Sequence, residues 1–283
     1  MKFSPSSDFQ AAALDAMREA TRAVLEVYAS ENPGIEYKDE KEPVTRADIQ
    51  ANQVLEKRLS DLRPDAGWLS EESERDLQAL ARKELIWVVD PIDGTREFID
   101  KNGEFSISVG LVQNGEPVWG AVSLPAEPRI MMSGRDGVAV YDLDSELQPE
   151  RKLLDKSAVD LRKSRICVSR TEWNKGLYSD QAQELQIHPE GSVARKLALV
   201  SVADYDLTVS LYPKNDWDIA GGLALVQAAG GLIIRPDTGT GIDLSPPGAR
   251  RPGLCCGRPD PVMQYHQFFQ HRGMKLRDRY GSS

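Results

Sequence analysis

The stretch 87–98 constrains the fold most, because in it a buried strand runs directly into a turn that carries two carboxylates. Residues 86–89 are apolar and β-branched or aromatic, which predicts a central strand, and Pro91 is expected to end that strand because it cannot donate to the ladder. Asp90 and Asp93 then lie three residues apart, followed by Gly-Thr, which predicts a cation site beside an anion site. The motif Asp-Pro-x-Asp-Gly-Thr fixes five positions, so a chance match is expected about once per few million windows.

Length and charge narrow the classes of function. The chain has 283 residues, 40% hydrophobic and 28% charged, which is typical of a globular protein with one large core or two coupled subdomains. A formal net charge of -9 argues against binding of nucleic acid polymers or acidic membranes, whereas a small phosphorylated substrate held through a metal remains compatible. No apolar segment of signal or membrane-spanning length is found at the N-terminus, so the cytoplasm is the expected location. Three cysteines without ligand-like spacing are expected to be reduced and buried.

Hydrophobic periodicity predicts a mixture of helices and strands. In the first half we expect helices over 8–30 and from Thr45 to Pro64, an exposed charged loop over 36–42, a short strand over 68–70, and hairpins over 105–124 and 130–141. In the second half we expect strands at 166–168, 207–209, 232–234 and 254–256, and helices over 192–203, 217–229 and 261–271. The polar segment 143–161 is the expected junction between an N-terminal α+β subdomain (1–145), with most metal ligands, and a C-terminal α/β subdomain (146–283). The pattern predicts a layered α/β or α+β fold.

Acidic residues stand at four element boundaries: Asp48, Glu71-Glu72, Asp90 with Asp93, and Asp218. Taken singly, each has an ordinary structural explanation, such as a helix cap for Asp48 or a favourable dipole interaction for Asp218 in a first helical turn. Together they need another explanation, because two carboxylates about 4 Å apart repel by about 4 kcal/mol at an effective dielectric near 20. Hard oxygen ligands favour Mg²⁺ over zinc, and the chain has only three histidines.

Four motifs carry a resemblance to a known family: Thr45-x-Ala-Asp48, Glu71-Glu72-Ser73, Asp90-Pro-Ile-Asp93-Gly-Thr95 and Trp217-Asp218-Ile-Ala-Gly221. In order and rough spacing they resemble the inositol monophosphatase superfamily of Mg²⁺-dependent, lithium-sensitive phosphomonoesterases. The resemblance spans nearly the whole chain and implies that family's five-layer αβαβα fold and, as is common in such families, a homodimer. One departure is Ser70, where a glycine often precedes the paired glutamates.

The resemblance also implies roles for individual residues. Five residues would hold two or three Mg²⁺ ions: Glu71, Asp90, Asp93 and Asp218 through their side chains, and Ile92 through its carbonyl. Thr95 and Asp48 would relay the proton of a metal-activated water, and Glu72 would support the same water or a metal from behind. The N–H groups of Gly94 and Thr95 would hold phosphate oxygens if a short helix begins there.

A second segment is similar to the family's Gly-Ser-x-x-Lys substrate segment. It comprises Gly191, Ser192, Arg195 and Lys196, with one extra residue before the lysine, so which cation meets a second phosphate stays open. The alternative for both cations is a solvated helix face. A different pattern, Asp204-x-Asp206-x-Thr208, resembles phosphatases that form an aspartyl phosphate, but the preceding apolar run has helical spacing, which argues against it.

The choice of phosphate ester rests on the residues around these motifs. Residues 96–99 and 102–105 look like the 3'(2'),5'-bisphosphate nucleotidase branch, and Leu211 stands where inositol enzymes tend to carry a glutamate for ring hydroxyls. A leucine cannot accept hydrogen bonds from hydroxyls. The resemblance therefore favours hydrolysis of adenosine 3',5'-bisphosphate to AMP and phosphate. A phosphatase of inositol or sugar monophosphates, and a non-catalytic binding protein on the same fold, remain alternatives.

Overall fold

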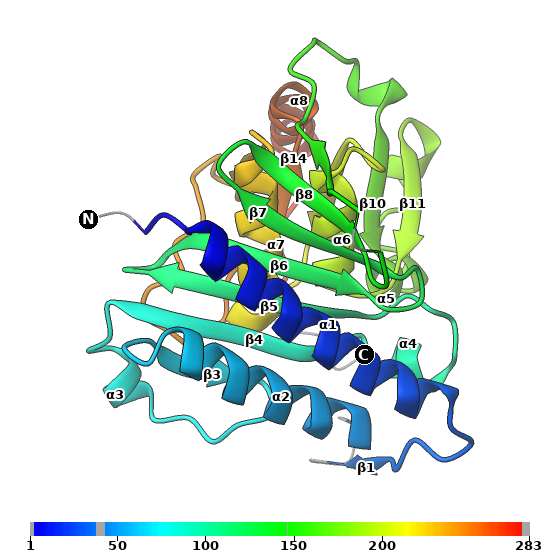
Figure 1. Ribbon diagram of the computed structural model, residues 1–283. Helices are drawn as coiled ribbons and strands as arrows, with labels where there is room; N and C mark the ends of the chain where they lie inside the picture. Colours follow the sequence, from blue (N-terminus) through cyan, green and yellow to red (C-terminus); the bar gives the residue numbers. More distant parts are fainter. Residues whose placement is uncertain (1–2, 38–42, 146, 279–283) are drawn as a thin grey trace.

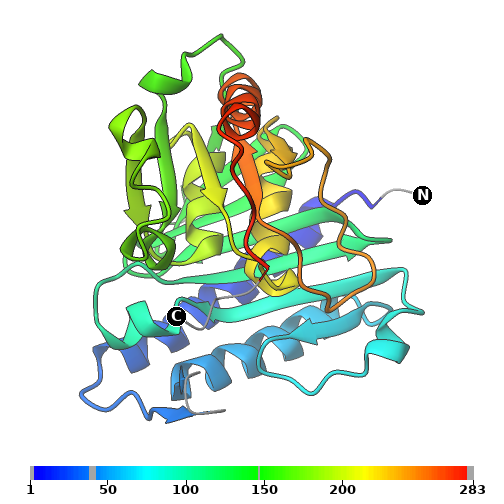
Figure 2. The same ribbon diagram turned by 180° about the vertical axis from the view of Figure 1, so that it is seen from behind.

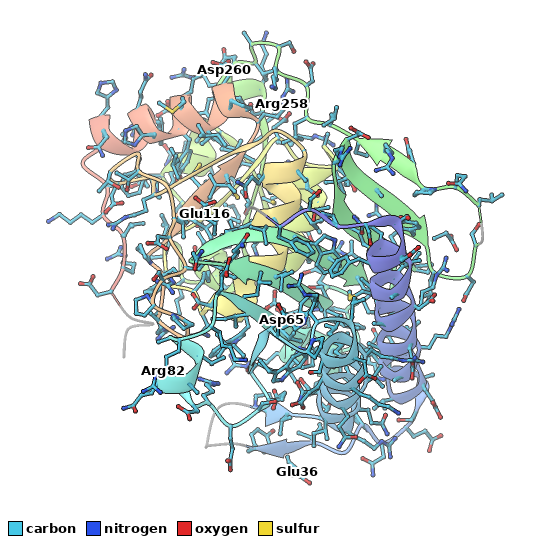
Figure 3. All side chains as sticks on the ribbon, turned by 60° about the vertical axis from the view of Figure 1, so that its left-hand side comes forward. Glu36, Asp65, Arg82, Glu116, Arg258 and Asp260 are labelled. Atoms are coloured by element: carbon cyan, nitrogen blue, oxygen red, sulfur yellow. The ribbon has the colours of Figure 1, made fainter. Side chains whose placement is uncertain are left out.

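The computed structural model describes residues 3–37, 43–145 and 147–278 as five alternating layers of helix and sheet (Figure 1). The first layer holds helices α1 (Ser7–Ala29) and α2 (Arg46–Leu62), which run side by side along one face of a large sheet (Figure 3). Each helix begins at a side-chain cap: Ser6 accepts from the Phe9 N–H, and Thr45 forms a capping box with Asp48. Apolar side chains of α1 and α2 pack on the sheet around Trp87.

A two-stranded ribbon precedes α2. It pairs β1 (Glu36–Tyr37) with β2 (Pro43–Val44), so the first two residues of the predicted loop form a strand, and residues 38–42 lie outside the described part. No helix in the described ranges is both long and apolar enough to cross a bilayer.

The second layer is a seven-stranded sheet in the order β3-β4-β5-β6-β7-β8-β9. Its strands are β3 (Gly67–Ser70), β4 (Leu85–Asp93), β5 (Ser106–Gln113), β6 (Glu116–Leu124), β7 (Arg129–Gly134), β8 (Gly137–Asp142) and β9 (Glu150–Lys152). The expectation that Pro91 ends the central strand is wrong. Pairing with β5 resumes at Asp93–Ser106 after a register shift beyond Asp90, and this irregularity takes the proline out of the regular ladder.

The third layer holds α6 (Val193–Ser201) and α7 (Asp216–Ala228) between the two sheets. Helix α7 lies very close to the large sheet, because β5 and β6 offer glycines where it crosses. A Cβ atom on Gly110 would lie 2.8 Å from the Ala220 Cβ, and one on Gly120 only 2.3 Å from the Gly221 oxygen. The sheet therefore fixes the body of the helix that carries Asp218.

The fourth layer is a five-stranded sheet in the order β11-β10-β12-β14-β13, covered on its outer face by α8 (Pro259–His271; Figure 2). Its strands are β10 (Arg165–Ser169), β11 (Gln186–Glu190), β12 (Leu207–Ser210), β13 (Leu232–Ile234) and β14 (Leu254–Gly257). The five-layer αβαβα fold is confirmed, and all three cysteines are free and buried. The boundary at 145/146 stays a prediction; β9, in the expected junction, joins the first sheet.

Short elements complete the chain. Helices α3 (Leu77–Leu80), α4 (Thr95–Ile99) and α5 (Arg170–Asn174) follow β3, β4 and β10, respectively. Helix α4 begins just after β4, beside Asp90 and Asp93, and α5 begins directly after β10.

Candidate active site

Three of the predicted metal ligands meet in space although they come from distant segments. Glu71 follows β3, Asp90 lies near the end of β4, and Asp218 lies in the first turn of α7. One carboxylate oxygen from each lies within 4.8 Å of the other two. Asp90 is buried, whereas Glu71 and Asp218 are half-buried. A cluster of one buried and two half-buried carboxylates is suited to a cation that keeps some of its water.

The electrostatics of this cluster favour bound cations. Burial, followed by repulsion from Glu71, Asp93 and Asp218, raises the pKa of Asp90 well above its ordinary value. Burial and repulsion from Asp93 likewise raise the pKa of Asp218 to about 7. Charged forms are disfavoured because like charges share a poorly solvated space, and a divalent cation would reverse that cost. The donor set of carboxylates, with no histidine or cysteine among them, fits a hard oxygen-seeking ion.

Asp93 is held differently from the other three. Its Oδ2 accepts hydrogen bonds from the Ser192 hydroxyl (2.7 Å) and the Ala194 N–H (2.6 Å) at the start of α6. It contributes to the repulsion at Asp90 and Asp218, so it lies near the cluster without belonging to the group of three. Its role as a ligand, like that of the Ile92 carbonyl, stays a prediction.

The predicted proton relay is assembled in part. The Thr95 hydroxyl lies 3.5 Å from Asp48 Oδ1 and 3.3 Å from the Ile92 carbonyl, both long for hydrogen bonds. Asp48 Oδ2 accepts from the Thr45 N–H (2.7 Å) and hydroxyl (2.6 Å), which orients the carboxylate. Helix α4 begins at Thr95, directly after Gly94 with φ of +94°, a conformation that favours glycine. The condition set for phosphate binding by Gly94 and Thr95, that a short helix begins here, is therefore met, and the binding itself stays a prediction.

A polar network holds the turn that bears Glu71 and Glu72. Asn52 of α2 accepts from the Ser70 hydroxyl (2.7 Å) and donates to the Ser73 hydroxyl (3.1 Å), and the Glu72 N–H donates to Ser70 (3.2 Å). Ser70, which departs from the family's glycine, therefore takes part in fixing the turn. The sequence offered one signal for Asn52, which is a polar residue on the apolar face of a predicted helix.

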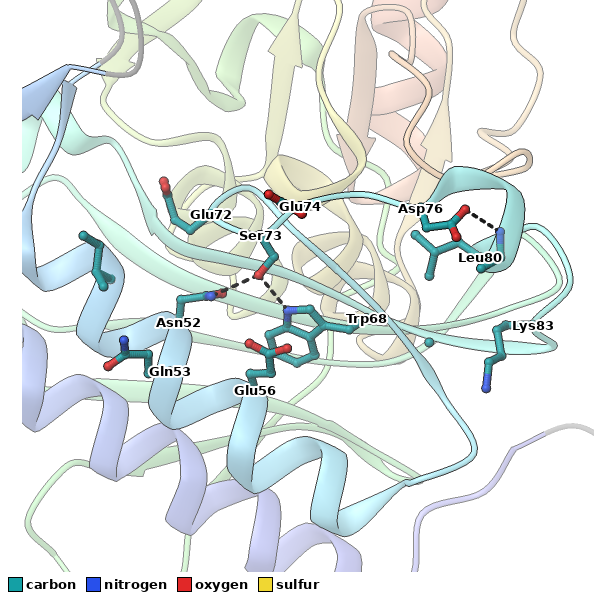
Figure 4. Close-up of a pocket in the computed structure, with 13 residues that line it drawn as sticks. Asn52, Gln53, Glu56, Trp68, Glu72, Ser73, Glu74, Asp76, Leu80 and Lys83 are labelled. Carbon is teal, nitrogen blue, oxygen red and sulfur yellow. Dashed lines mark hydrogen bonds between the residues drawn. The ribbon is translucent and has the colours of Figure 1, made fainter.

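A pocket of about 670 Å³ lies beside this turn, between α2 and the segment that follows β3 (Figure 4). The Ser73 hydroxyl accepts from both Asn52 and the Trp68 indole N–H within it (Figure 4). Glu72 is the one predicted site residue among its lining residues. The pocket therefore adjoins the carboxylate cluster without containing it.

The predicted substrate segment lies at the N-terminus of α6, next to Asp93. The Ser192 hydroxyl caps α6 by accepting from the Arg195 N–H (2.9 Å), and Lys196 Nζ donates to the carbonyls of Gly191 (3.1 Å) and Ser192 (2.5 Å). The Arg195 guanidinium pairs instead with Glu127 (2.5 Å) and Glu190 (3.2 Å). Both cations are buried, so the alternative of a solvated helix face is wrong.

Two further residues hold this segment: Arg170, which the sequence did not indicate, and Glu104, which stands in the stretch 102–105 but whose contact was not predicted. Glu104 accepts from the Gly191 N–H (2.7 Å) and pairs with Arg170, which also donates to the Pro189 carbonyl (3.1 Å). The link joins the loop after α4 to the start of α6. No local signal could have revealed it, because Glu104 lies 87 residues from Gly191.

The aspartyl-phosphate pattern is accounted for by structure. The run before Asp204 is helix α6, as its spacing predicts. Asp204 pairs with Arg129 (3.0 Å) and Asp206 with Arg258 (2.9 Å), both after the C-terminal end of α6, whereas Asp93 lies at its N-terminus.

Comparisons with known proteins give a family match and several relatives. The model of the inositol monophosphatase family matches residues 6–261. Proteins described as 3'(2'),5'-bisphosphate nucleotidase CysQ are similar to the chain: that of Shigella flexneri is 34% identical and that of Escherichia coli K12 is 33% identical, each over 76% of this chain and 86% of the relative.

Solved structures resemble the fold. The extragenic suppressor protein suhB from Bartonella henselae superposes with a TM-score of 0.77 at 23% identity, covering 92% of this chain and 98% of that one. CysQ from Bacteroides thetaiotaomicron, described as a bacterial member of the inositol monophosphatase family, superposes with a TM-score of 0.70 at 25% identity, covering 88% and 96%.

Proposed function

The chain belongs to the inositol monophosphatase family and is a metal-dependent phosphatase, and from this we propose that it hydrolyses adenosine 3',5'-bisphosphate to AMP and phosphate with Mg²⁺. The observation that carries the proposal is the cluster of Glu71, Asp90 and Asp218, because three carboxylates this close repel one another and a bound cation relieves that repulsion. The substrate follows from the CysQ relatives, which are described as 3'(2'),5'-bisphosphate nucleotidases.

In the proposed site, Glu71, Asp90, Asp93, Asp218 and the Ile92 carbonyl hold two or three Mg²⁺ ions. Bound Mg²⁺ would act as a Lewis acid, lowering the pKa of a coordinated water and neutralising the leaving alkoxide.

The chain's own groups move the proton. The Thr95 oxygen accepts a proton from the attacking water while its hydroxyl proton passes to Asp48 Oδ1, and Glu72 supports the water from behind. The 3.5 Å separation between Thr95 and Asp48 is expected to shorten in the substrate complex, as catalytic hydrogen bonds often do.

The N–H groups of Gly94 and Thr95 hold the oxygens of the reacting phosphate at the start of α4. Beside these N–H groups, Gly191 and Ser192 at the start of α6 form one wall of the proposed substrate site. Lys196 contributes its charge through the two carbonyls that it binds. Arg195 acts indirectly, by holding the substrate segment, because its guanidinium is bound by Glu127 and Glu190. Expectations of a homodimer and a cytoplasmic location stay predictions.

Steady-state turnover of a panel of esters tests the proposal: adenosine 3',5'-bisphosphate, an inositol monophosphate and a sugar monophosphate, each with Mg²⁺ and with or without Li⁺. We expect the nucleotide to give the highest kcat/KM and Li⁺ to inhibit. Equal rates on inositol phosphate and the nucleotide would favour the broader phosphatase. Absence of metal-dependent turnover on every ester would favour a binding protein.

A further inference from the structure

Two buried ion pairs stand on either side of one residue, Asn215, just before α7. Lys214 Nζ lies 3.2 Å from Glu172 Oε1, and Arg251 Nε lies 2.6 Å from Asp216 Oδ1. All four side chains are buried, with exposed fractions of 2% and 0% in the first pair and 7% and 2% in the second. The acceptor Glu172 and the donor Arg251 lie 42 and 35 residues from their partners, so distant segments hold this short stretch on both sides.

Asn215 is the residue that connects these pairs to the site. Its backbone N–H donates to Asp218 Oδ2 at 2.9 Å, which forms half of the capping box of α7. The backbone on its N-terminal side is pinned further, because Lys214 and Arg251 exchange two main-chain hydrogen bonds of 2.8 and 2.7 Å. The direction of the Asp218 carboxylate therefore depends on where Asn215 is held.

Glu172 fixes more than the lysine. Its carboxylate also accepts from the backbone N–H groups of Leu211 (2.9 Å) and Tyr212 (3.1 Å) and from the hydroxyl groups of Ser210 (2.8 Å) and Tyr178 (2.6 Å). The whole connection from the end of β12 to the start of α7 is thus organised around one buried carboxylate.

Stability alone is a poor reason for such pairs. The desolvation of two charges offsets much of their attraction, and apolar replacements of a whole buried pair are often neutral or stabilising. Their arrangement around Asn215 suggests a different role. The body of α7 is fixed by the large sheet, but the first turn of a helix lacks internal partners for its N–H groups and depends on its cap.

We propose that Glu172 and Arg251 are positioning residues for the metal centre. By holding Lys214 and Asp216 they fix Asn215, and Asn215 in turn holds the Asp218 carboxylate within reach of Glu71 and Asp90. This inference rests on the proposed function, in which Asp218 is a metal ligand. We call each of the two ion pairs, Glu172–Lys214 and Asp216–Arg251, a clamp. Because each clamp is neutral overall, it adds no net charge that would oppose the binding of cations.

Paired substitutions separate positioning from stability. E172Q/K214M and D216N/R251M each remove a clamp without leaving an unpaired buried charge, so both are expected to fold. The readout is binding of Mn²⁺, followed by the electron paramagnetic resonance signal of the free ion, with Mg²⁺ measured by competition. We expect each variant to bind the ion about tenfold more weakly, a typical cost of removing the support of a metal ligand.

Tyr265→Phe is the matched control, because it removes one buried hydrogen bond, to Gln181 (2.7 Å), neither partner of which lies in the connection or in the two ion pairs. It should change the thermal midpoint and leave ion affinity unchanged. Ion affinity within twofold of wild type in a folded clamp variant would overturn the proposal. Failure of both clamp variants to fold would overturn it as well, because the ion pairs would then serve the stability of the fold. Wild-type protein that binds no divalent ion would instead refute the proposed function.

Discussion

Replacing Asp90 with asparagine should stabilise the protein without metal and destabilise it, relative to wild type, with metal. Asp90 is buried, and its pKa is raised by burial and by the carboxylates around it, so its charge opposes folding when no cation is bound. Asparagine has nearly the same shape. Its carbonyl can still accept from the Ile92 N–H, which lies 3.0 Å from Asp90 Oδ1 in the wild type.

The size of the effect follows from the geometry. Two ionised carboxylates separated by 4.8 Å, the limit found for Glu71, Asp90 and Asp218, repel by roughly 3.5 kcal/mol at an effective dielectric near 20. Partial protonation relieves some of this repulsion. In chelator we therefore expect the free energy of unfolding of D90N to exceed that of wild type by about 2 kcal/mol, which raises the thermal midpoint by about 4 °C for a chain of this size. With Mg²⁺ at 100 times its dissociation constant, ion binding raises the free energy of unfolding of wild type by about 2.7 kcal/mol, whereas it raises that of D90N little.

Differential scanning calorimetry at pH 8, in EDTA and in excess Mg²⁺, measures both differences. The expected result is a reversal of order, with D90N melting above wild type in EDTA and below it in Mg²⁺. D100N, at an exposed aspartate after α4, is the control and should follow wild type in both conditions. If D90N melts below wild type in EDTA, or if Mg²⁺ raises both proteins equally, the explanation of the cluster as a metal site is wrong.

Three further predictions concern the proton relay, the titration of the cluster and the substrate segment. T95A should lower kcat by about 100-fold with ion affinity unchanged, as loss of acid–base assistance does, while T95S keeps most of the activity; equal kcat values for T95A and wild type would rule out the relay. In EDTA, the free energy of unfolding should fall between pH 4 and pH 7, because folding raises the pKa of Asp218 from 3.8 to about 7 and the folded state therefore binds that proton more tightly. D218N should flatten this dependence on pH. An unchanged dependence would contradict the assignment of the titration to Asp218. E104A, which frees Arg170 and the Gly191 N–H, should raise KM more than it lowers kcat, and kinetics with unchanged KM would count against a role for Glu104.

The sequence predicts most elements because their signals are local. Apolar periodicity and caps locate α1, α2 and α7 to within a residue or two, and Asn-Gly at 114–115 sets the turn of the β5–β6 hairpin. Strand β11 was missed, because three of its five residues are polar, none is buried, and the strand exists through parallel pairing with β10. The pairing that resumes beyond Pro91 was missed for a similar reason: it needs the partner strand β5 to accept the register shift.

For the site, motif spacing located the acidic residues but did not predict the contacts of the basic side chains. Arg195 and Lys196 lie on a segment that resembles a substrate segment, yet their environment is decided by groups far away along the chain. Glu127 lies 68 residues from Arg195, and it binds the guanidinium that the motif left as one of two candidates for contacting a phosphate. Ion pairs of this kind join segments whose proximity follows only from the assembled layers, so no local pattern predicts them.

The structural and functional explanations of the acids turn out to be compatible. Three of them lie at helix N-termini, and each uses Oδ2 to accept a backbone N–H: Asp48 from Thr45, Asp93 from Ala194, and Asp218 from Asn215. A helix N-terminus carries partial positive charge, so each cap lowers the cost of a carboxylate in the metal-free protein and also fixes its direction. Capping therefore fixes Asp48 and Asp218 at the starts of α2 and α7, and holds Asp93 of β4 against the start of α6, before any cation binds.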